Sequence, residues 1–93
     1  MTGNLTGDVR ARLLANLDEL FGLVEPQHEH WANWLRGCRA LIGRDDVRGL
    51  DRFLEGVTES GGLADLDLPE HAERVGELIA ACHDDATALR HPG

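Results

Sequence analysis

Apolar residues recur every three or four positions along most of the 93-residue chain, which is the spacing of one face of an α-helix. The pattern predicts four helices, over residues 7–24, 26–42, 46–56 and 69–90. No stretch shows the strict alternation of apolar and polar residues that is typical of a half-buried strand. Because each helix has a single apolar face to bury, we expect one all-α domain over residues 1–93, either a small four-helix bundle or an orthogonal helical array.

Proline, glycine and aspartate mark the predicted helix ends. Pro26 and Pro69 suit the first turn of a helix, where the missing N–H costs no hydrogen bond, so each is expected to open one. Gly43 is expected to cap the C-terminus of the second helix, and Asp45 or Asp46 the N-terminus of the third. The resulting connections are short, apart from the one between the third and fourth helices.

That longer connection, residues 58–68, reads TESGGLADLDL. It is too short and too isolated to be a strand with a partner. The Gly-Gly pair indicates a turn, and the leucines that follow need to be buried. We therefore expect an ordered loop that places Leu63, Leu66 and Leu68 over the open end of the bundle.

The segment HEHWANWLRGC, residues 28–38, combines possible metal ligands with aromatic side chains. On a helix its apolar residues share one stripe with those that follow it: Trp31, Trp34, Leu35, Cys38, Leu41 and Ile42. His28 and His30 then lie about 160° apart around the helix axis, on opposite borders of the stripe. Two rings so placed cannot chelate one ion, so the segment is interpreted as an aromatic wall of the core with polar borders.

The two cysteines, Cys38 and Cys82, are expected to be buried, reduced thiols, because each lies on a predicted apolar stripe. If the second and fourth helices are neighbours, these cysteines and His83 would supply three soft metal ligands. His83, however, falls at the edge of its stripe. His71 is interpreted as a structural histidine, since no second catalytic group accompanies it.

Charge is distributed unevenly along the chain, which has a formal net charge of −8. Residues 1–44 hold as many acids as arginines, so all of the excess falls in residues 45–93. An acidic balance disfavours nucleic acid, whose binding depends on cationic neutralisation of phosphates, and favours a basic protein partner. The candidate protein-binding surface consists of six acids: Asp45, Asp46, Asp51, Glu55, Asp65 and Asp67.

Several classes of protein find no support in the sequence. No apolar run is long enough for a transmembrane helix and no secretory signal opens the chain, so no membrane association and a cytoplasmic location are expected. No glycine-rich phosphate loop is present, and no nucleophile lies beside a base. We therefore expect a protein that is not an enzyme and holds no cofactor.

Residues 30–68 also follow a longer pattern. A helical HWxxWL is followed by an acidic D…GL and then by a GG…DL loop. This order resembles a family of short bacterial proteins classed as a domain of unknown function. The matching residues are His30, Trp31, Trp34, Leu35, Asp46, Gly49, Leu50, Gly61, Gly62, Asp65 and Leu66. The resemblance implies a small helical bacterial domain and adds no chemistry.

Three hypotheses for the function follow. The first is a non-enzymatic, acidic protein-interaction module, such as an immunity or antitoxin-like protein or an accessory subunit. The alternative is a helical bundle that binds a metal or a small ligand through histidines and cysteines. Its candidate ligands are His28, His30, His71, His83, Cys38 and Cys82. The third is a homodimer, in which the chain is its own partner.

Overall fold

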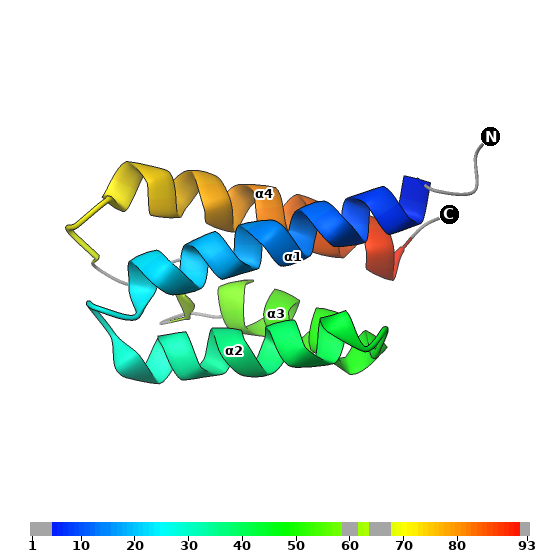
Figure 1. Cartoon of the computed structure of the whole chain (residues 1–93), viewed down its shortest axis with the longest axis horizontal. Helices are drawn as coiled ribbons and strands as arrows, with labels where there is room; N and C mark the ends of the chain where they lie inside the picture. The colour runs from blue at the N-terminus through cyan, green and yellow to red at the C-terminus, as the bar shows by residue number, and fades with distance from the viewer. Residues whose placement is uncertain (1–4, 59–61, 64–67, 92–93) are drawn as a thin grey trace.

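Four helices and their connections make up the computed structural model, which describes residues 5–58, 62–63 and 68–91. The helices are α1 (Leu5–Val24), α2 (Glu29–Gly43), α3 (Val47–Thr58) and α4 (Ala72–Arg90) (Figure 1). No residue in the described ranges belongs to a strand, and the prediction of a small all-α bundle is confirmed. None of these four helices is long and apolar enough to cross a membrane.

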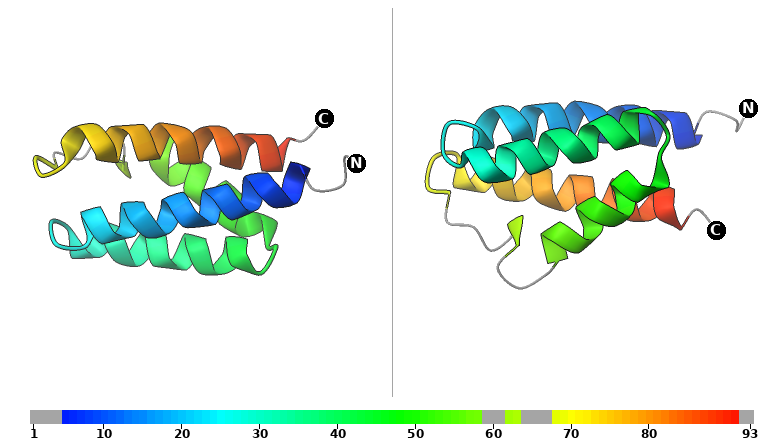
Figure 2. Two further views of the ribbon diagram at one scale, coloured as in Figure 1. Left: turned by 45° about the horizontal axis from the view of Figure 1, so that its top comes forward. Right: turned by 90° about the horizontal axis from the view of Figure 1, so that it is seen from below.

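The helices form a closed ring of neighbours. α1 packs along α4 and α2, and α3 packs on α2 and α4, so α2 and α4 lie diagonally across the bundle. α3 crosses the other helices obliquely, whereas α1, α2 and α4 follow the long axis (Figure 2). The α1–α2 turn and the start of α4 lie at one end of the bundle, and the α2–α3 turn and the end of α4 lie at the other (Figure 1).

The core is aliphatic, with the fully buried ring of Phe53 at its centre. Its buried apolar side chains are Leu13, Leu17, Leu20, Val24, Ala32, Leu35, Cys38, Ile42, Leu50, Phe53, Val57, Leu63, Leu68, Val75, Leu78, Cys82 and Ala86. Leu63 and Leu68 are buried, as expected for the segment after α3, while Leu66 lies outside the described residues. Trp31 and Trp34 are only partly buried, because the centre of the α2 stripe falls on Ala32, Leu35 and Cys38 instead.

Two glycines of α3 allow it to approach α2 closely. A Cβ atom at Gly49 would lie 2.9 Å from the backbone nitrogen of Ile42, and one at Gly56 would lie 2.0 Å from the Trp34 ring. That ring stacks on Phe53 with their centroids 5.8 Å apart. The two glycines are seven residues apart and so share one helix face, which makes that face a flat seat for α2.

Two helices begin three residues later than predicted. α2 starts at Glu29, because His28 has an extended backbone (φ −158°) and its Nδ1 accepts a hydrogen bond from the backbone N–H of Trp31 at 3.4 Å. α4 starts at Ala72, because His71 adopts a left-handed conformation (φ 62°). Pro26 and Pro69 therefore precede these helices and do not open them, and His28 lies outside α2.

The other predicted ends shift by smaller amounts. Gly43 is the last residue of α2, and the left-handed position expected for a capping glycine falls on Asp45 (φ 60°). Asp46 caps α3, as one of the two predicted alternatives. α1 begins at Leu5 and α3 ends at Thr58, so Gly56 lies inside α3, two residues before its end.

Candidate functional site

The predicted cysteine ligands are not paired across the bundle. Cys38 lies on α2 and Cys82 on the diagonally opposite α4, and both are buried free thiols. Burial raises the pKa of Cys38 to about 11, although Arg52 lowers it in part. Burial and Asp85 together raise the pKa of Cys82 to about 12. Thiols held in the protonated form are poor nucleophiles and poor metal ligands.

The histidines do not gather into a ligand set either. His28, His30 and His71 lie at the end where α2 and α4 begin, whereas His83 is half-buried further along α4. The ring centroids of His28 and His30 are 6.2 Å apart, and those of His30 and Trp31 are 5.6 Å apart in an edge-to-face arrangement. Over residues 5–58, 62–63 and 68–91, no group of three or more His, Cys, Asp or Glu side chains is arranged to hold a metal ion.

The candidate acidic surface around α3 receives arginines from distant helices. Asp45, in the α2–α3 turn, forms an ion pair with Arg10 of α1. Asp51 on α3 accepts a hydrogen bond from Nε of Arg90, on α4, at 2.6 Å. Both arginines lie far from their partners in the sequence, so the pairing depends on the fold.

Asp46 is paired within its own turn. Its Oδ1 accepts the backbone N–H of Arg48 at 3.0 Å, and its Oδ2 accepts Nη2 of the same residue at 2.7 Å. These hydrogen bonds lower the pKa of Asp46 to about 2. Glu55 is exposed, and no ion pair joins it to another described residue. Asp65 and Asp67 lie outside the described residues.

Arginines balance most of the acids at this surface. Three of the four described candidates are paired with an arginine: Asp45 with Arg10, Asp46 with Arg48 and Asp51 with Arg90. Opposite charges interspersed in this way leave little net field to attract a basic partner.

Among the four helices, the excess negative charge lies on α1 and α4. The acids of α1 and α4 are Asp8, Asp18, Glu19, Glu73, Glu77, Asp84 and Asp85, against Arg10, Arg12, Arg74 and Arg90. Those of α2 and α3 are Glu29, Asp51 and Glu55, against Arg36, Arg39, Arg48 and Arg52. The fold thus separates an acidic α1–α4 side from a balanced α2–α3 side, a division that the linear charge count did not predict.

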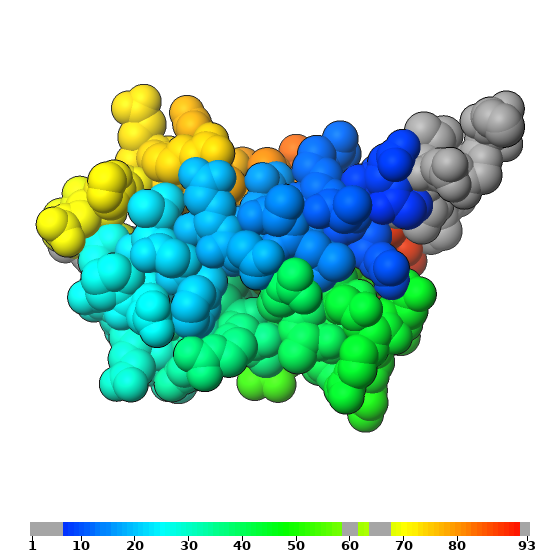
Figure 3. All heavy atoms as spheres, viewed as in Figure 1, coloured from blue at the N-terminus to red at the C-terminus, as the bar shows by residue number. Residues whose placement is uncertain are grey.

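Four exposed carboxylates without an arginine partner among the described residues lie where α2 and α4 begin: Glu25, Glu29, Glu70 and Glu73. We call this group the acidic end; its segments, the α1–α2 turn and the start of α4, adjoin at one edge of the space-filling view (Figure 3). Gln27 fixes the two segments together, because its Nε2 donates to the carbonyl of Glu70 at 2.8 Å and its Oε1 accepts the Glu70 N–H at 3.0 Å. Glu29 and Glu73 also stabilise the helix N-termini that they occupy.

Other acids of the α1–α4 side are tied to arginines. Arg12 donates to both carboxylate oxygens of Asp85 at 3.0 and 2.8 Å, and Asp85 is the one charged residue buried among those described. Arg74 donates in the same two-bond manner to Glu19, whose pKa is lowered by that hydrogen bonding. Asp85 follows His83 and Asp84 in the sequence, and in the fold it joins α4 to α1 through Arg12.

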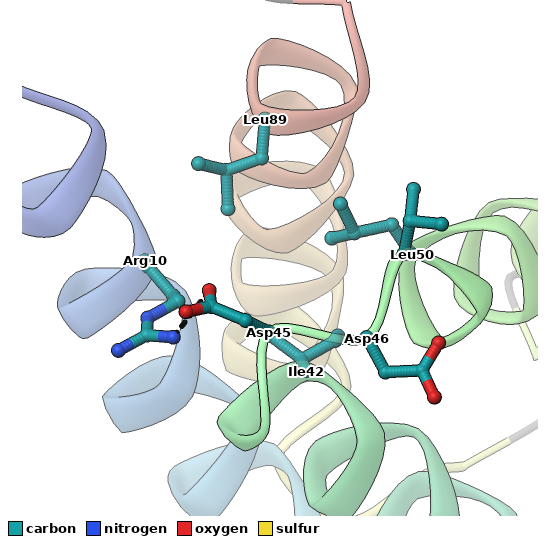
Figure 4. A pocket seen from close by; sticks show the side chains of 7 residues that line it. Arg10, Ile42, Asp45, Asp46, Leu50 and Leu89 are labelled. Carbon is teal, nitrogen blue, oxygen red and sulfur yellow. Dashed lines mark ion pairs between the residues drawn. The ribbon is translucent and has the colours of Figure 1, made fainter.

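The opposite end of the bundle holds a pocket with a volume of about 200 Å³. All four helices contribute to its lining, which consists of Arg10, Ile42, Asp45, Asp46, Val47, Leu50 and Leu89. The Arg10–Asp45 ion pair stands on one side of the aliphatic residues, and the carboxylate of Asp46 points away from them (Figure 4). Val47 is 47% exposed and is the large apolar side chain that the described residues leave open to solvent. We call these seven residues the pocket end.

Comparison of the chain with protein-family models, with curated proteins and with solved structures finds no match. The resemblance of residues 30–68 to a family of short bacterial proteins therefore stays a prediction.

Proposed function

We propose that the protein is a non-enzymatic interaction module that binds a basic protein partner through its acidic end. The observation that carries this proposal is the distribution of unpaired carboxylates. Within the described residues, acids along the sides of the bundle are repeatedly held by arginines, whereas Glu25, Glu29, Glu70 and Glu73 face solvent together without one. A concentrated field of one sign steers an oppositely charged partner and sets the rate of association.

The acidic end is also a stable platform for binding. Gln27 joins the α1–α2 turn to the start of α4, so the four carboxylates are carried on segments that are fixed relative to each other. A preorganised surface loses less conformational entropy when a partner binds. An immunity or antitoxin-like protein and an accessory subunit are two kinds of protein that would use such a surface against a basic partner.

The test compares three immobilised proteins for capture of partners from the native host. The first is the wild type, the second carries Glu29→Gln, Glu70→Gln and Glu73→Gln, and the matched control is another triple neutralisation. The control variant carries Asp8→Asn, Glu55→Gln and Asp84→Asn, three exposed acids away from the acidic end.

We expect the same host protein on the wild type and on the control variant, and a loss of at least about tenfold in its affinity for the acidic-end variant. The association rate should fall as salt is raised, because exposed charges are screened. Equal capture by all three proteins, or capture that does not respond to salt, contradicts the proposal.

A further inference from the structure

The pocket end carries Val47, the large apolar side chain that the described residues leave open to solvent, beside a pocket with an aliphatic lining. Ile42, Leu50 and Leu89 line the pocket from three different helices, and Val47 stands at its edge, 47% exposed. With a volume of about 200 Å³, the pocket is smaller than typical small-molecule sites, which begin at about 300 Å³. It is sized for one or two apolar side chains from another protein chain.

Charges around the pocket indicate which chain that is. Arg10 and Asp45 form an ion pair at the rim, and Asp46, whose carboxylate points away from the pocket, is neutralised by Arg48. The rim therefore carries both signs in equal number, unlike the acidic end. In a two-fold symmetric contact, if a residue of one copy meets a second residue of the other copy, the same contact occurs again with the copies exchanged. Such an interface therefore requires a patch that is complementary to itself. An ion pair of balanced charge beside an apolar centre meets that requirement.

The remaining charge of the molecule agrees with this orientation. The bundle is 42 Å along its longest axis, and the acidic end lies opposite the pocket end. Two copies joined at their pocket ends place their acidic ends as far apart as the fold allows. That separation is several times the Debye screening length, which is about 8 Å at physiological salt, so repulsion between the acidic ends is weak.

We propose that the pocket end is a self-association surface, on which a second copy of this chain docks with two-fold symmetry. The Val47 side chain of each copy packs against the pocket of the other. Arg10 of one copy meets Asp45 of its partner, in exchange for the pair that each makes within its own chain. This proposal does not depend on the acidic end, which stays free on both copies.

The first experiment is sedimentation of the full chain from low micromolar to millimolar concentration. The wild type is expected to shift from the monomer mass of 10.2 kDa toward twice that mass. Val47→Asp should weaken the dimer at least about tenfold, because it places a charge at the centre of the contact. Ala80→Asp, an exposed position on α4 away from the pocket, adds the same charge and should dimerise like the wild type.

A second experiment uses charge exchange to identify the symmetry. Arg10→Asp and Asp45→Arg each place like charges across the two-fold contact, so each variant alone should be monomeric. An equimolar mixture should form a heterodimer, since both cross-pairs are then of opposite sign. Circular dichroism establishes that each variant is folded, which is expected because both side chains lie at the surface.

Three results would overturn the proposal. One is a wild type that stays monomeric at millimolar concentration, and another is a mixture of the two charge variants that does not associate. The third is a monomeric wild type whose capture of a basic host protein is weakened by Val47→Asp, which would assign the pocket to that partner. Loss of the acidic-end interaction alone leaves the dimer unchanged, so the two proposals fail separately.

Discussion

The α1·α4 pair and the α2·α3 pair meet through different kinds of contact. α1 and α4 are 20 and 19 residues long, and they join through leucine side chains and cross-helix ion pairs such as Arg12–Asp85. α2 and α3 are 15 and 12 residues long, and they join where Gly49 lies against the backbone of Ile42 and Gly56 lies under the ring of Trp34. The first pair is acidic and the second is balanced in charge.

Helix length explains the difference. A long helix buries enough aliphatic surface to be held at the usual separation by its side chains. A helix of 12 residues has few side chains to bury, and closer backbone approach gives it more van der Waals contact per residue. The α1·α4 pair should therefore be sensitive to loss of side-chain volume, and the α2·α3 pair to gain of volume.

Chemical labelling of the two cysteines, one on each helix pair, is expected to show the largest effect. At a pKa of about 12, Cys82 on α4 should hold about 1,000-fold less thiolate than an ordinary thiol, and Cys38 on α2, at about 11, about 100-fold less. Alkylation followed by mass spectrometry should find both protected at neutral pH, and Cys38 labelled first as the pH is raised. Rapid labelling of either thiol in the folded protein contradicts the burial that causes these shifts.

Shrinking a leucine tests the α1·α4 pair. Leu17→Ala should lower the free energy of unfolding by about 3 kcal/mol, because Leu17 is buried and its removal leaves a cavity. Leu23→Ala, at a partly buried position of the same helix, is the matched control and should cost less. Urea unfolding followed by circular dichroism measures both; an equal cost would mean that α1 does not depend on its buried seam.

Adding one methyl group tests the α2·α3 pair. Gly49→Ala should cost about 1–2 kcal/mol even after the gain in helix propensity, because the new Cβ would overlap the backbone of Ile42 and the helices must separate. Gly76→Ala is the control, since nothing lies within 4 Å of its added Cβ, and it should stabilise α4 by about 0.5–1 kcal/mol. The same sign for both substitutions would show that the close approach is not needed.

The smallest expected effect is electrostatic and depends on pH. The pKa of Asp46 is lowered from 3.8 to about 2 in the folded protein, so its stabilising contribution is complete above about pH 4 and is lost as the pH falls toward 2. Asp46→Asn keeps a side chain that caps α3 and removes the charge. The stability difference between the two proteins should shrink as the pH falls from about 4 through about 2; a difference that does not change with pH would show that the charge of Asp46 contributes nothing.

Periodicity was sufficient to predict the number of helices and most of the core, since Leu13, Leu17, Phe53 and Cys82 are buried as their spacing requires. The starts of α2 and α4 were wrong because proline at the first helical position is a preference, and the backbone of His71 decides the start of α4. The role of Gly56 is not visible in the sequence, because it depends on a side chain of another helix. Only the fold shows that Trp34 covers it.

The candidate site was less predictable than the fold. A count of charges along the chain located the acids, but it did not locate the arginines that neutralise them. Asp51 is paired by Arg90 and Asp45 by Arg10, and these partners are distant in sequence and adjacent only after folding. Asp85 was hidden for the same reason, because its burial depends on Arg12, 73 positions earlier.

That separation of 73 positions has a consequence for the order of folding. The α2·α3 contacts close a short loop, whereas the α1·α4 contacts must first bring distant parts of the chain together, at a larger cost in chain entropy. We expect the α2–α3 hairpin to be formed in the transition state and α1 to dock on α4 late. Mutations at Gly49 would then slow folding, and mutations at Leu17 would mainly speed unfolding.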